Sequence, residues 1–241
     1  MDFNGLLNLM LEQRASDLFI TADVQPSLKI NGQIRPIGKT KLTATMIAQL
    51  LQSIMNEKQR LEFATTREAN FAINNQDRTA RFRVSAFQQR DAPGMVLRRI
   101  ENKIPDIETL NLPPILKELS MTKRGIIILV GATGSGKSTS LAAMIGYRNH
   151  NAQGHIITIE DPIEYLHKNK RSVVSQREVG SDTQDYLTAI RASLRQSPDV
   201  IQLGEMRDYD TIMATVTAAE TGLLILSTLH TLGAANTVDR V

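Results

Sequence analysis

The residues from Gly131 to Ser138 have the types and spacing of a loop that binds nucleotide phosphates. They read GATGSGKS and fit the pattern G-x-x-x-x-G-K-[ST] at every fixed position. Glycine lets backbone N–H groups close around phosphate oxygens without a Cβ in the way, and a following helix adds positive charge at its N-terminus. In such loops the lysine, here Lys137, reaches the β- and γ-phosphates, and the hydroxyl at the next position binds Mg²⁺. The expected nucleotide-binding residues are Gly131, Ala132, Thr133, Gly134, Ser135, Gly136, Lys137, Ser138 and Thr139.

The segments on either side of the loop support this interpretation. Residues 125–130 are a run of aliphatic side chains typical of a buried strand, and residues 139–145 have apolar side chains at helical spacing. The alternative is a chance glycine-rich turn before a helix. Because strand, loop and helix occur in the required order, we expect a nucleotide here, ATP in our hypothesis, together with Mg²⁺.

Carboxylates follow two further predicted strands, residues 155–159 and 200–203. They are Glu160, Asp161 and Glu164 after the first strand and Glu205 after the second. Ligands of open parallel sheets gather at the carboxyl ends of the strands, so these acids are candidates for holding Mg²⁺ or for activating water. A purely structural role stays open for each of them, and Glu205 could instead be an acid at a helix N-terminus.

Two sets of basic side chains also have two interpretations each. His230 follows the last predicted strand, where it could cap the strand end or contact the γ-phosphate of a nucleotide. Arg81 and Arg83 share one face of an alternating strand, and Arg98 and Arg99 end another. These arginines could form a solvated face of a sheet, or they could present guanidinium groups to an anion such as a phosphate in a neighbouring subunit.

Two domains must position these residues. Residues 1–100 predict antiparallel strands with two or three helices, including a hairpin at Asn31-Gly32, where both residues tolerate positive φ. Prolines and asparagines interrupt any periodicity in residues 101–114, which therefore predict a linker. In residues 115–241 strands and helices alternate, as they do in parallel α/β domains. The predicted fold class is α/β, preceded by an α+β module.

Capping residues predict where several helices begin. Thr43 opens one helix, a second follows Asp182 and Thr183, and a third runs from Asp208 to Glu220, where Gly222 closes it.

Composition excludes several classes of protein. With 41% hydrophobic and 22% charged residues among 241, the chain is ordinary for a soluble protein. It has no cysteine, which excludes disulfides and thiolate zinc sites, and no apolar run long enough to cross a bilayer. The N-terminus does not resemble a secretion signal. A net charge of +3 and 4% aromatic residues offer little to nucleic acid. We expect a cytoplasmic protein with no transmembrane segment, whose membrane association is peripheral, and no nucleic-acid partner.

Five segments together resemble the secretion ATPases of type IV pili and type II secretion. They are residues 131–139, 158–165 (TIEDPIEY), 176–179 (QREV), 199–208 (DVIQLGEMRD) and 227–231 (STLHT). In order, they are similar to the family's Walker A motif, Asp box, a following loop, Walker B motif and His box. The resemblance covers nearly the whole chain. Within the family, the chain is most similar to the twitching-motility retraction ATPases of the PilT and PilU type. Residues 95–100 and 142–149 favour the PilU branch, and 204–208 the PilT branch.

This resemblance implies an architecture and a set of roles. A PAS-like domain would precede a RecA-like P-loop ATPase domain in a hexameric ring, with nucleotide between the two domains. The implied catalytic residues are Lys137, Glu164 as the water-activating acid, Glu205 of the Walker B motif, His230 of the His box, and Arg81 and Arg98 as the arginines delivered to the phosphates. The implied metal-binding residues are Ser138, Glu160 and Glu205.

Two departures from the family bear on this assignment. The ATPases for pilus extension and type II secretion usually carry a four-cysteine metal-binding subdomain, so the lack of cysteine favours the retraction branch. The chain also stops at Val241, inside a predicted helix, whereas the family continues, so we expect the sequence to be truncated.

Three functions compete. The leading hypothesis is an ATP-hydrolysing motor that powers pilus retraction and twitching motility at the inner face of the cytoplasmic membrane, together with the pilus platform protein. The second is an accessory ring subunit that binds nucleotide and depends on a paralogous retraction ATPase, as PilU-like proteins are thought to do. A RecA-like nucleic-acid motor is the third, and the weak net charge disfavours it.

Overall fold

Two units make up the chain, Met1–Asn102 and Lys103–Val241, and each is described here by itself. The computed structural model describes residues 2–100, 104–231, 233, 235 and 237. Within these residues, no helix is both long and apolar enough to cross a membrane.

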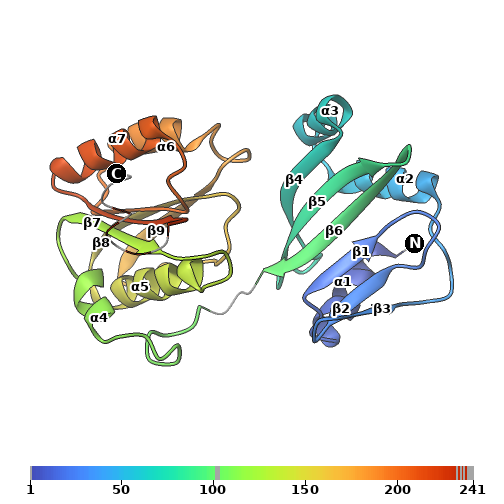
Figure 1. Ribbon diagram of the computed structural model, residues 1–241, viewed down its shortest axis with the longest axis horizontal. Helices are drawn as coiled ribbons and strands as arrows, with labels where there is room; N and C mark the ends of the chain where they lie inside the picture. The colour runs from blue at the N-terminus through green and yellow to red at the C-terminus, as the bar shows by residue number, and fades with distance from the viewer. Residues whose placement is uncertain (1, 101–103, 232, 234, 236, 238–241) are drawn as a thin grey trace. The chain divides into compact units, whose positions relative to one another are not determined.

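The first unit is an antiparallel sheet with three helices (Figure 1). In chain order its elements are α1 (Phe3–Glu12), β1 (Asp17–Ile20), β2 (Ser27–Ile30), β3 (Gln33–Pro36), α2 (Ala44–Ile54), α3 (Glu57–Thr66), β4 (Glu68–Asn74), β5 (Arg81–Gln89) and β6 (Ala92–Ile100). The six strands are arranged in the order β3-β2-β1-β6-β5-β4. The predicted hairpin is confirmed, since Ile30 pairs with Gln33 and both Asn31 and Gly32 have positive φ.

One face of this sheet holds the core of the first unit. Leu18, Phe82 and Leu97 are fully buried and belong to one cluster with Leu7 of α1 and Ile47 of α2. Strand residues alternate between faces, so the neighbours of these side chains point the other way. The alternation predicted for β5 is confirmed, because Phe82, Val84 and Ala86 are buried while Arg81 and Arg83 lie on the other face.

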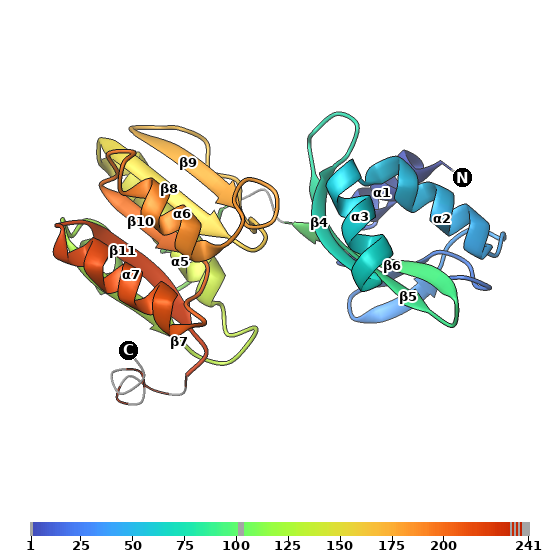
Figure 2. The same ribbon diagram turned by 90° about the horizontal axis from the view of Figure 1, so that it is seen from above.

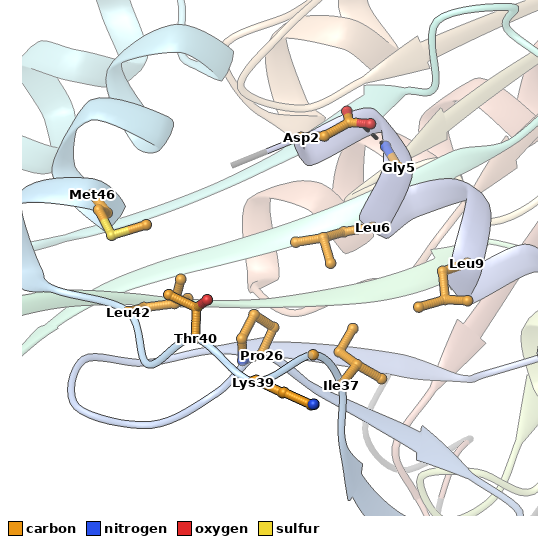
Figure 3. Close-up of a pocket in the computed structure, with 11 residues that line it drawn as sticks. Asp2, Gly5, Leu6, Leu9, Pro26, Ile37, Lys39, Thr40, Leu42 and Met46 are labelled. Carbon is orange, nitrogen blue, oxygen red and sulfur yellow. Dashed lines mark hydrogen bonds between the residues drawn. The ribbon is translucent and has the colours of Figure 1, made fainter.

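An apolar cavity of about 540 Å³ also lies in the first unit (Figure 3). Leu6 and Leu9 of α1 line it together with Ile37, Leu42 and Met46. Asp2 stands at its edge, where it accepts a hydrogen bond from Gly5 N at 2.9 Å and caps α1. None of its lining residues belongs to the phosphate loop.

The second unit is a parallel sheet with helices on both faces (Figure 1). Its elements are α4 (Ile115–Ser120), β7 (Gly125–Val130), α5 (Lys137–Asn151), β8 (Gly154–Glu160), β9 (Ser172–Glu178), α6 (Tyr186–Ser193), β10 (Val200–Leu203), α7 (Tyr209–Glu220) and β11 (Leu224–Leu229). The strand order is β7-β11-β10-β8-β9. Helices α6 and α7 cover one face, and α4 and α5 cover the other (Figures 1 and 2). The predicted α/β fold class is therefore confirmed.

The segment that precedes α4 packs on this unit. Ile107 is 2% exposed and shares a core cluster with Leu141 and Met144 of α5. Residues 101–103 of the predicted linker lie outside the described residues. Of the predicted helix that reaches Val241, Ala235 and Thr237 are described and are helical, and residues 238–241 lie outside the described residues.

The far end of α5 is tied to two other segments. Arg148 is 8% exposed, and its Nη1 donates to Ser120 O at 2.9 Å and to Thr122 O at 2.7 Å. The side chain of Asn149 donates to Lys168 O at 2.8 Å and accepts from Lys170 N at 3.2 Å. Buried polar side chains with satisfied partners fix the position of the elements they join.

One prediction for this unit needs correction. The segment 176–179 was expected to be a loop, but residues 176–178 belong to strand β9, which pairs in parallel with β8. The helix predicted after Asp182 and Thr183 is confirmed as α6, which begins at Tyr186, where the N-cap Asp185 accepts from Thr188 N at 2.7 Å. The start predicted for α7 is confirmed, since Asp208 accepts from Thr211 N.

Candidate active site

The phosphate-loop sequence lies between β7 and α5. Helix α5 starts at Lys137, and its N-cap residue Gly136 has a φ of 91°, which favours glycine. No side chain caps the first turn of this helix. The first-turn N–H groups therefore have no side-chain acceptor at the position where such helices bind anions.

Lys137 folds back over the loop that precedes it. Its Nζ donates to Gly131 O and to Ala132 O, each at 2.9 Å. The side chain is half-buried, whereas Ser138 beside it is exposed. Thr139 forms a hydrogen bond at 3.1 Å between its Oγ1 and the hydroxyl of Tyr165, which ties the first turn of α5 to the segment that carries Glu164.

The predicted functional residues of this unit follow neighbouring strands. The phosphate loop follows β7, His230 follows β11, Glu205 comes two residues after β10, and Glu160 ends β8. These four strands are adjacent in the order β7-β11-β10-β8, and each neighbouring pair is parallel. Their carboxyl ends therefore meet at one edge of the sheet, which is where ligands bind in open α/β sheets.

Glu160 is buried, and both of its carboxylate oxygens have partners. It is 7% exposed and accepts from Thr158 Oγ1 at 2.6 Å, from Gln176 Nε2 at 3.3 Å and from Glu164 N at 3.4 Å. Burial raises the pKa of Glu160 above its ordinary value, because a charged carboxylate loses hydration there. The side chain of Glu164 is exposed, so two acids four residues apart have opposite surroundings.

Glu205 lies between two basic side chains. Its Oε2 is 3.4 Å from His230 Nε2, and its Oε1 accepts from Arg207 Nε at 2.5 Å. Arg207 also lies 3.9 Å from a carboxylate oxygen of Asp161. The hydrogen bond to Glu205 raises the pKa of Arg207, so the guanidinium stays charged. The motifs assigned no role to Arg207, although its place two residues after the strand-end acid Glu205 was a usable signal.

Tyr186 is a second residue without a predicted role at this edge. Burial raises the pKa of its phenol, and the carboxylates of Asp161 and Glu205 add to the effect. Its hydroxyl packs against Gly204, where an added Cβ would lie 2.9 Å from the Tyr186 oxygen. Gly204 is therefore the residue that leaves room for the tyrosine beside Glu205.

The residues expected to bind Mg²⁺ differ in how well they fit that task. Ser138 offers an exposed hydroxyl at the helix start, and Glu205 a carboxylate whose side chain is 19% exposed. Both fit a nucleotide-bound Mg²⁺, which takes few protein ligands because phosphates and waters complete its shell. Glu160, with three protein hydrogen bonds, fits an outer shell better than direct coordination. Among the described residues, no cluster of three or more His, Asp or Glu side chains could hold a metal by itself.

Arg81 and Arg98 belong to the sheet of the first unit. Arg98 is paired across the strands with Arg83 and with Asp17. Its Nε donates to Asp17 Oδ1 at 2.8 Å, and the Arg98 side chain is 70% exposed whereas that of Asp17 is 5% exposed. Arg81 is half-buried at the start of β5. Arg98 is therefore exposed, and it is also the partner of a buried carboxylate.

A parallel sheet with a phosphate loop and acids at its carboxyl edge defines the class of P-loop nucleotide-binding proteins. The family model described as "Type II/IV secretion system protein" matches residues 2–241, and the chain belongs to that family. This confirms the resemblance that the sequence motifs predicted.

The relatives narrow the comparison. The chain is 55% identical over its whole length to the type IV pilus ATPase PilU of Pseudomonas aeruginosa, and 44% identical over its whole length to the retraction ATPase PilT of the same organism. The match covers 63% of the PilU protein and 70% of the PilT protein. The chain thus spans less than two thirds of the length of this PilU relative. The predicted similarity to the PilU branch agrees with the higher identity.

Solved structures agree with the sequence relatives. A crystal structure of the pilus retraction motor PilT with bound ADP matches with a TM-score of 0.95 and 41% identity, over 100% of this chain and 70% of that one. The ATPase DotB of Legionella pneumophila matches with a TM-score of 0.87 and 31% identity, over 98% of this chain and 68% of that one.

Proposed function

We propose that this chain carries the ATP-binding and ATP-hydrolysing site of a motor that powers type IV pilus retraction and twitching motility. The observation that carries the proposal is the alignment of the phosphate loop, His230, Glu205 and Glu160 along four neighbouring strand ends. The similarity to PilU and to PilT supports the proposal. One crystal structure of PilT is described with bound ADP.

The phosphate loop binds and neutralises the nucleotide in this proposal. Residues 131–139 supply backbone N–H groups, and Lys137 exchanges its carbonyl partners Gly131 and Ala132 for phosphate oxygens. Bound Mg²⁺ would neutralise charge that develops on the phosphates. Ser138 and Glu205 would hold the metal, with Glu160 in the outer shell.

Glu164 is the proposed residue that orients the attacking water and accepts its proton. Its side chain is exposed, so the carboxylate has access to solvent, and buried side chains hold the backbone that carries it. His230 would orient Glu205 through the 3.4 Å contact and would approach the γ-phosphate.

The proposal also covers the domains of the chain, its assembly with further copies of itself and its place in the cell. A PAS-like domain of residues 1–100 is joined through 101–114 to a RecA-like domain of residues 115–241, and the chain forms a homohexamer. Arg81 and Arg98 are delivered to nucleotide bound between domains, since a guanidinium fork fits phosphate oxygens. The ring works in the cytoplasm at the inner face of the cytoplasmic membrane, where it contacts the pilus platform protein.

The test combines a biochemical and a cellular measurement. Purified protein should hydrolyse ATP in the presence of Mg²⁺, and a strain that lacks the gene should lose pilus retraction. Loss of retraction without ATP hydrolysis by the purified protein would contradict the motor.

The second candidate function is an accessory ring subunit that binds nucleotide but depends on a paralogous retraction ATPase. The chain is more similar to PilU than to PilT, and this supports the accessory function as the second candidate. Deleting the gene with and without its paralogue separates the two. An autonomous motor retracts pili in the strain without the paralogue, and an accessory subunit does not.

A further inference from the structure

The segment that carries Glu164 is held by side chains that contact its backbone. Glu178 accepts from Ile163 N at 3.0 Å, and Glu160 accepts from Glu164 N at 3.4 Å. Gln176 makes two more contacts, because its Nε2 donates to Tyr165 O at 2.8 Å and its Oε1 accepts from His167 N at 2.7 Å. Three side chains from β8 and β9 therefore hold the backbone of residues 163–167.

Gln176 is the member of this set that joins the segment to the strand-end acid. Besides Tyr165 and His167 it contacts Glu160, to which Nε2 donates at 3.3 Å. It lies opposite Thr158 in the β8–β9 register, and Thr158 donates to the same carboxylate oxygen of Glu160. One amide thus connects β8, β9 and the segment around Glu164.

The orientation of this amide is fixed by its partners. A carbonyl and a carboxylate accept hydrogen bonds only, and a backbone N–H only donates, so one amide orientation satisfies all three contacts. The flipped amide would face two acceptors with its oxygen and a donor with its nitrogen. No other uncharged side chain of similar length offers two donors and an acceptor in one plane.

We propose that Gln176 is a positioning residue that sets the place of Glu164 for attack by water. This inference rests on the proposed ATPase function, and it adds a residue to which the sequence motifs gave no role. Gln176 does not touch the phosphate loop in this scheme. Its loss therefore changes the step in which Glu164 acts and leaves nucleotide binding in place.

The experiment compares Gln176→Leu with the wild-type chain in steady-state ATP hydrolysis and in equilibrium binding of a fluorescent ATP analogue. Leucine is of similar size and makes none of the three hydrogen bonds. We expect kcat to fall on the order of 10- to 100-fold, because a small displacement of a catalytic group has effects of that size. We expect the dissociation constant of the analogue to change by less than about twofold. Gln153→Leu, at an exposed position just before β8, is the matched control and should behave like wild type.

A double-mutant cycle distinguishes positioning from a general structural role. If Gln176 acts through Glu164, Gln176→Leu should cause no further fall of kcat in a Glu164→Gln background. An independent, additive fall would overturn the inference, and so would wild-type kcat in Gln176→Leu or full activity in Glu164→Gln.

A second variant covers the case in which Gln176→Leu does not fold. Gln176→Glu keeps the size of the side chain and replaces both N–H donors by an acceptor that faces the Glu160 carboxylate and Tyr165 O. We expect the same loss of kcat from it, and full activity would overturn the inference. If the wild-type chain and Gln153→Leu hydrolyse ATP while both Gln176 variants match them, only the inference falls. If the wild-type chain hydrolyses no ATP, the proposed function falls with it.

Discussion

Glu205 and His230 meet at the ends of two neighbouring strands, with 3.4 Å between Oε2 and Nε2. The contact joins the acid that follows β10 to the histidine that follows β11, and Arg207 holds the other oxygen of the same carboxylate. A carboxylate fixed on both oxygens presents its remaining lone pairs in a defined direction, as a metal-binding acid requires.

The first prediction concerns Lys137. Lys137→Ala should reduce hydrolysis by orders of magnitude, because it removes the positive charge that reaches the transferred phosphoryl group. Thermal unfolding should stay near wild type, since the hydrogen bonds of this side chain to the described residues are two, both to loop carbonyls. Lys123→Ala, at an exposed position just before β7, makes the same charge change and serves as the control. Wild-type turnover in Lys137→Ala would contradict the assignment of residues 131–138 as a phosphate loop.

The second prediction separates the two acids. Glu164→Gln should bind ATP and barely hydrolyse it, because an amide cannot take a proton from water. Glu205→Gln should slow hydrolysis and shift its Mg²⁺ dependence to higher concentrations, because an amide is a weaker metal ligand than a carboxylate. Titrating Mg²⁺ at fixed ATP provides the measurement, with exposed Glu220→Gln as the control. If Glu205→Gln traps ATP while Glu164→Gln stays active, the two roles are reversed.

The third prediction concerns Arg98, where stability and activity must be separated. Arg98→Ala should reduce activity by a large factor if the guanidinium reaches phosphate, and Arg98→Lys should rescue it poorly. The alanine variant also deprives the buried Asp17 of its ion pair and should lose about 1 kcal/mol of stability for that reason alone. Asp17→Asn removes the same pair while keeping Arg98. Equal activity loss in Asp17→Asn and Arg98→Ala would assign the effect to the pair.

The fourth prediction tests Arg81 across subunits. Arg81→Ala should lose activity while it binds nucleotide and stays folded, and Arg83→Ala, exposed on the same strand, should not. If the arginine acts across a subunit boundary, mixing Arg81→Ala and Glu164→Gln chains should create some intact composite sites. ATPase activity of the mixture should then exceed that of either variant alone. Absence of restoration would indicate that Arg81 acts within one subunit. Full activity of Arg81→Ala alone would indicate that Arg81 only belongs to a solvated face of the sheet.

The fifth prediction concerns pH and His167. Burial lowers the pKa of this histidine to about 4, and the charge of nearby Lys170 adds to the effect. The unfolded chain takes up this proton near pH 6.5, so stability from this group is complete above that pH and falls as the pH drops toward 4. The full loss amounts to about 3 kcal/mol. The measurement is urea unfolding between about pH 4.5 and about pH 7.5, a range that covers most of this change. The free energy of unfolding of His167→Gln should depend less on pH than that of the wild type. His150→Gln, at an exposed position, should not, and an unchanged slope in His167→Gln would contradict the assignment.

Local signals explain which elements were predictable. Thr43 was expected to open a helix, and its side chain does accept from Met46 N at the start of α2. Helix α3 went unpredicted because none of its residues is buried, so it has no apolar period, although Asn56 and Gln59 form a capping box. Strand β9 was missed because it lies at the edge of the sheet and is mostly polar along its second half.

Sequence alone could name candidate residues for the site, but it could not predict their surroundings. The spacing of motifs identified Lys137, Glu164 and Glu205 as candidates, because strand ends and loops determine where such residues gather. Sequence could not tell that Glu160 is buried while Glu164 is exposed, since both follow the same strand. The contacts of Gln176 and Arg207 depend on which strands become neighbours, and that order is a property of the whole sheet.

Helix α5 and the chain from 161 to 171 are fastened together near both ends of the helix. Thr139, in the first turn, holds Tyr165, and Asn149, in the last turn, holds Lys168 and Lys170. Hydrogen bonds at both ends of the helix restrain the segment more than a contact at one end would. The phosphate loop and the chain around Glu164 are thus linked through one helix, and these hydrogen bonds favour a constant spacing between the two.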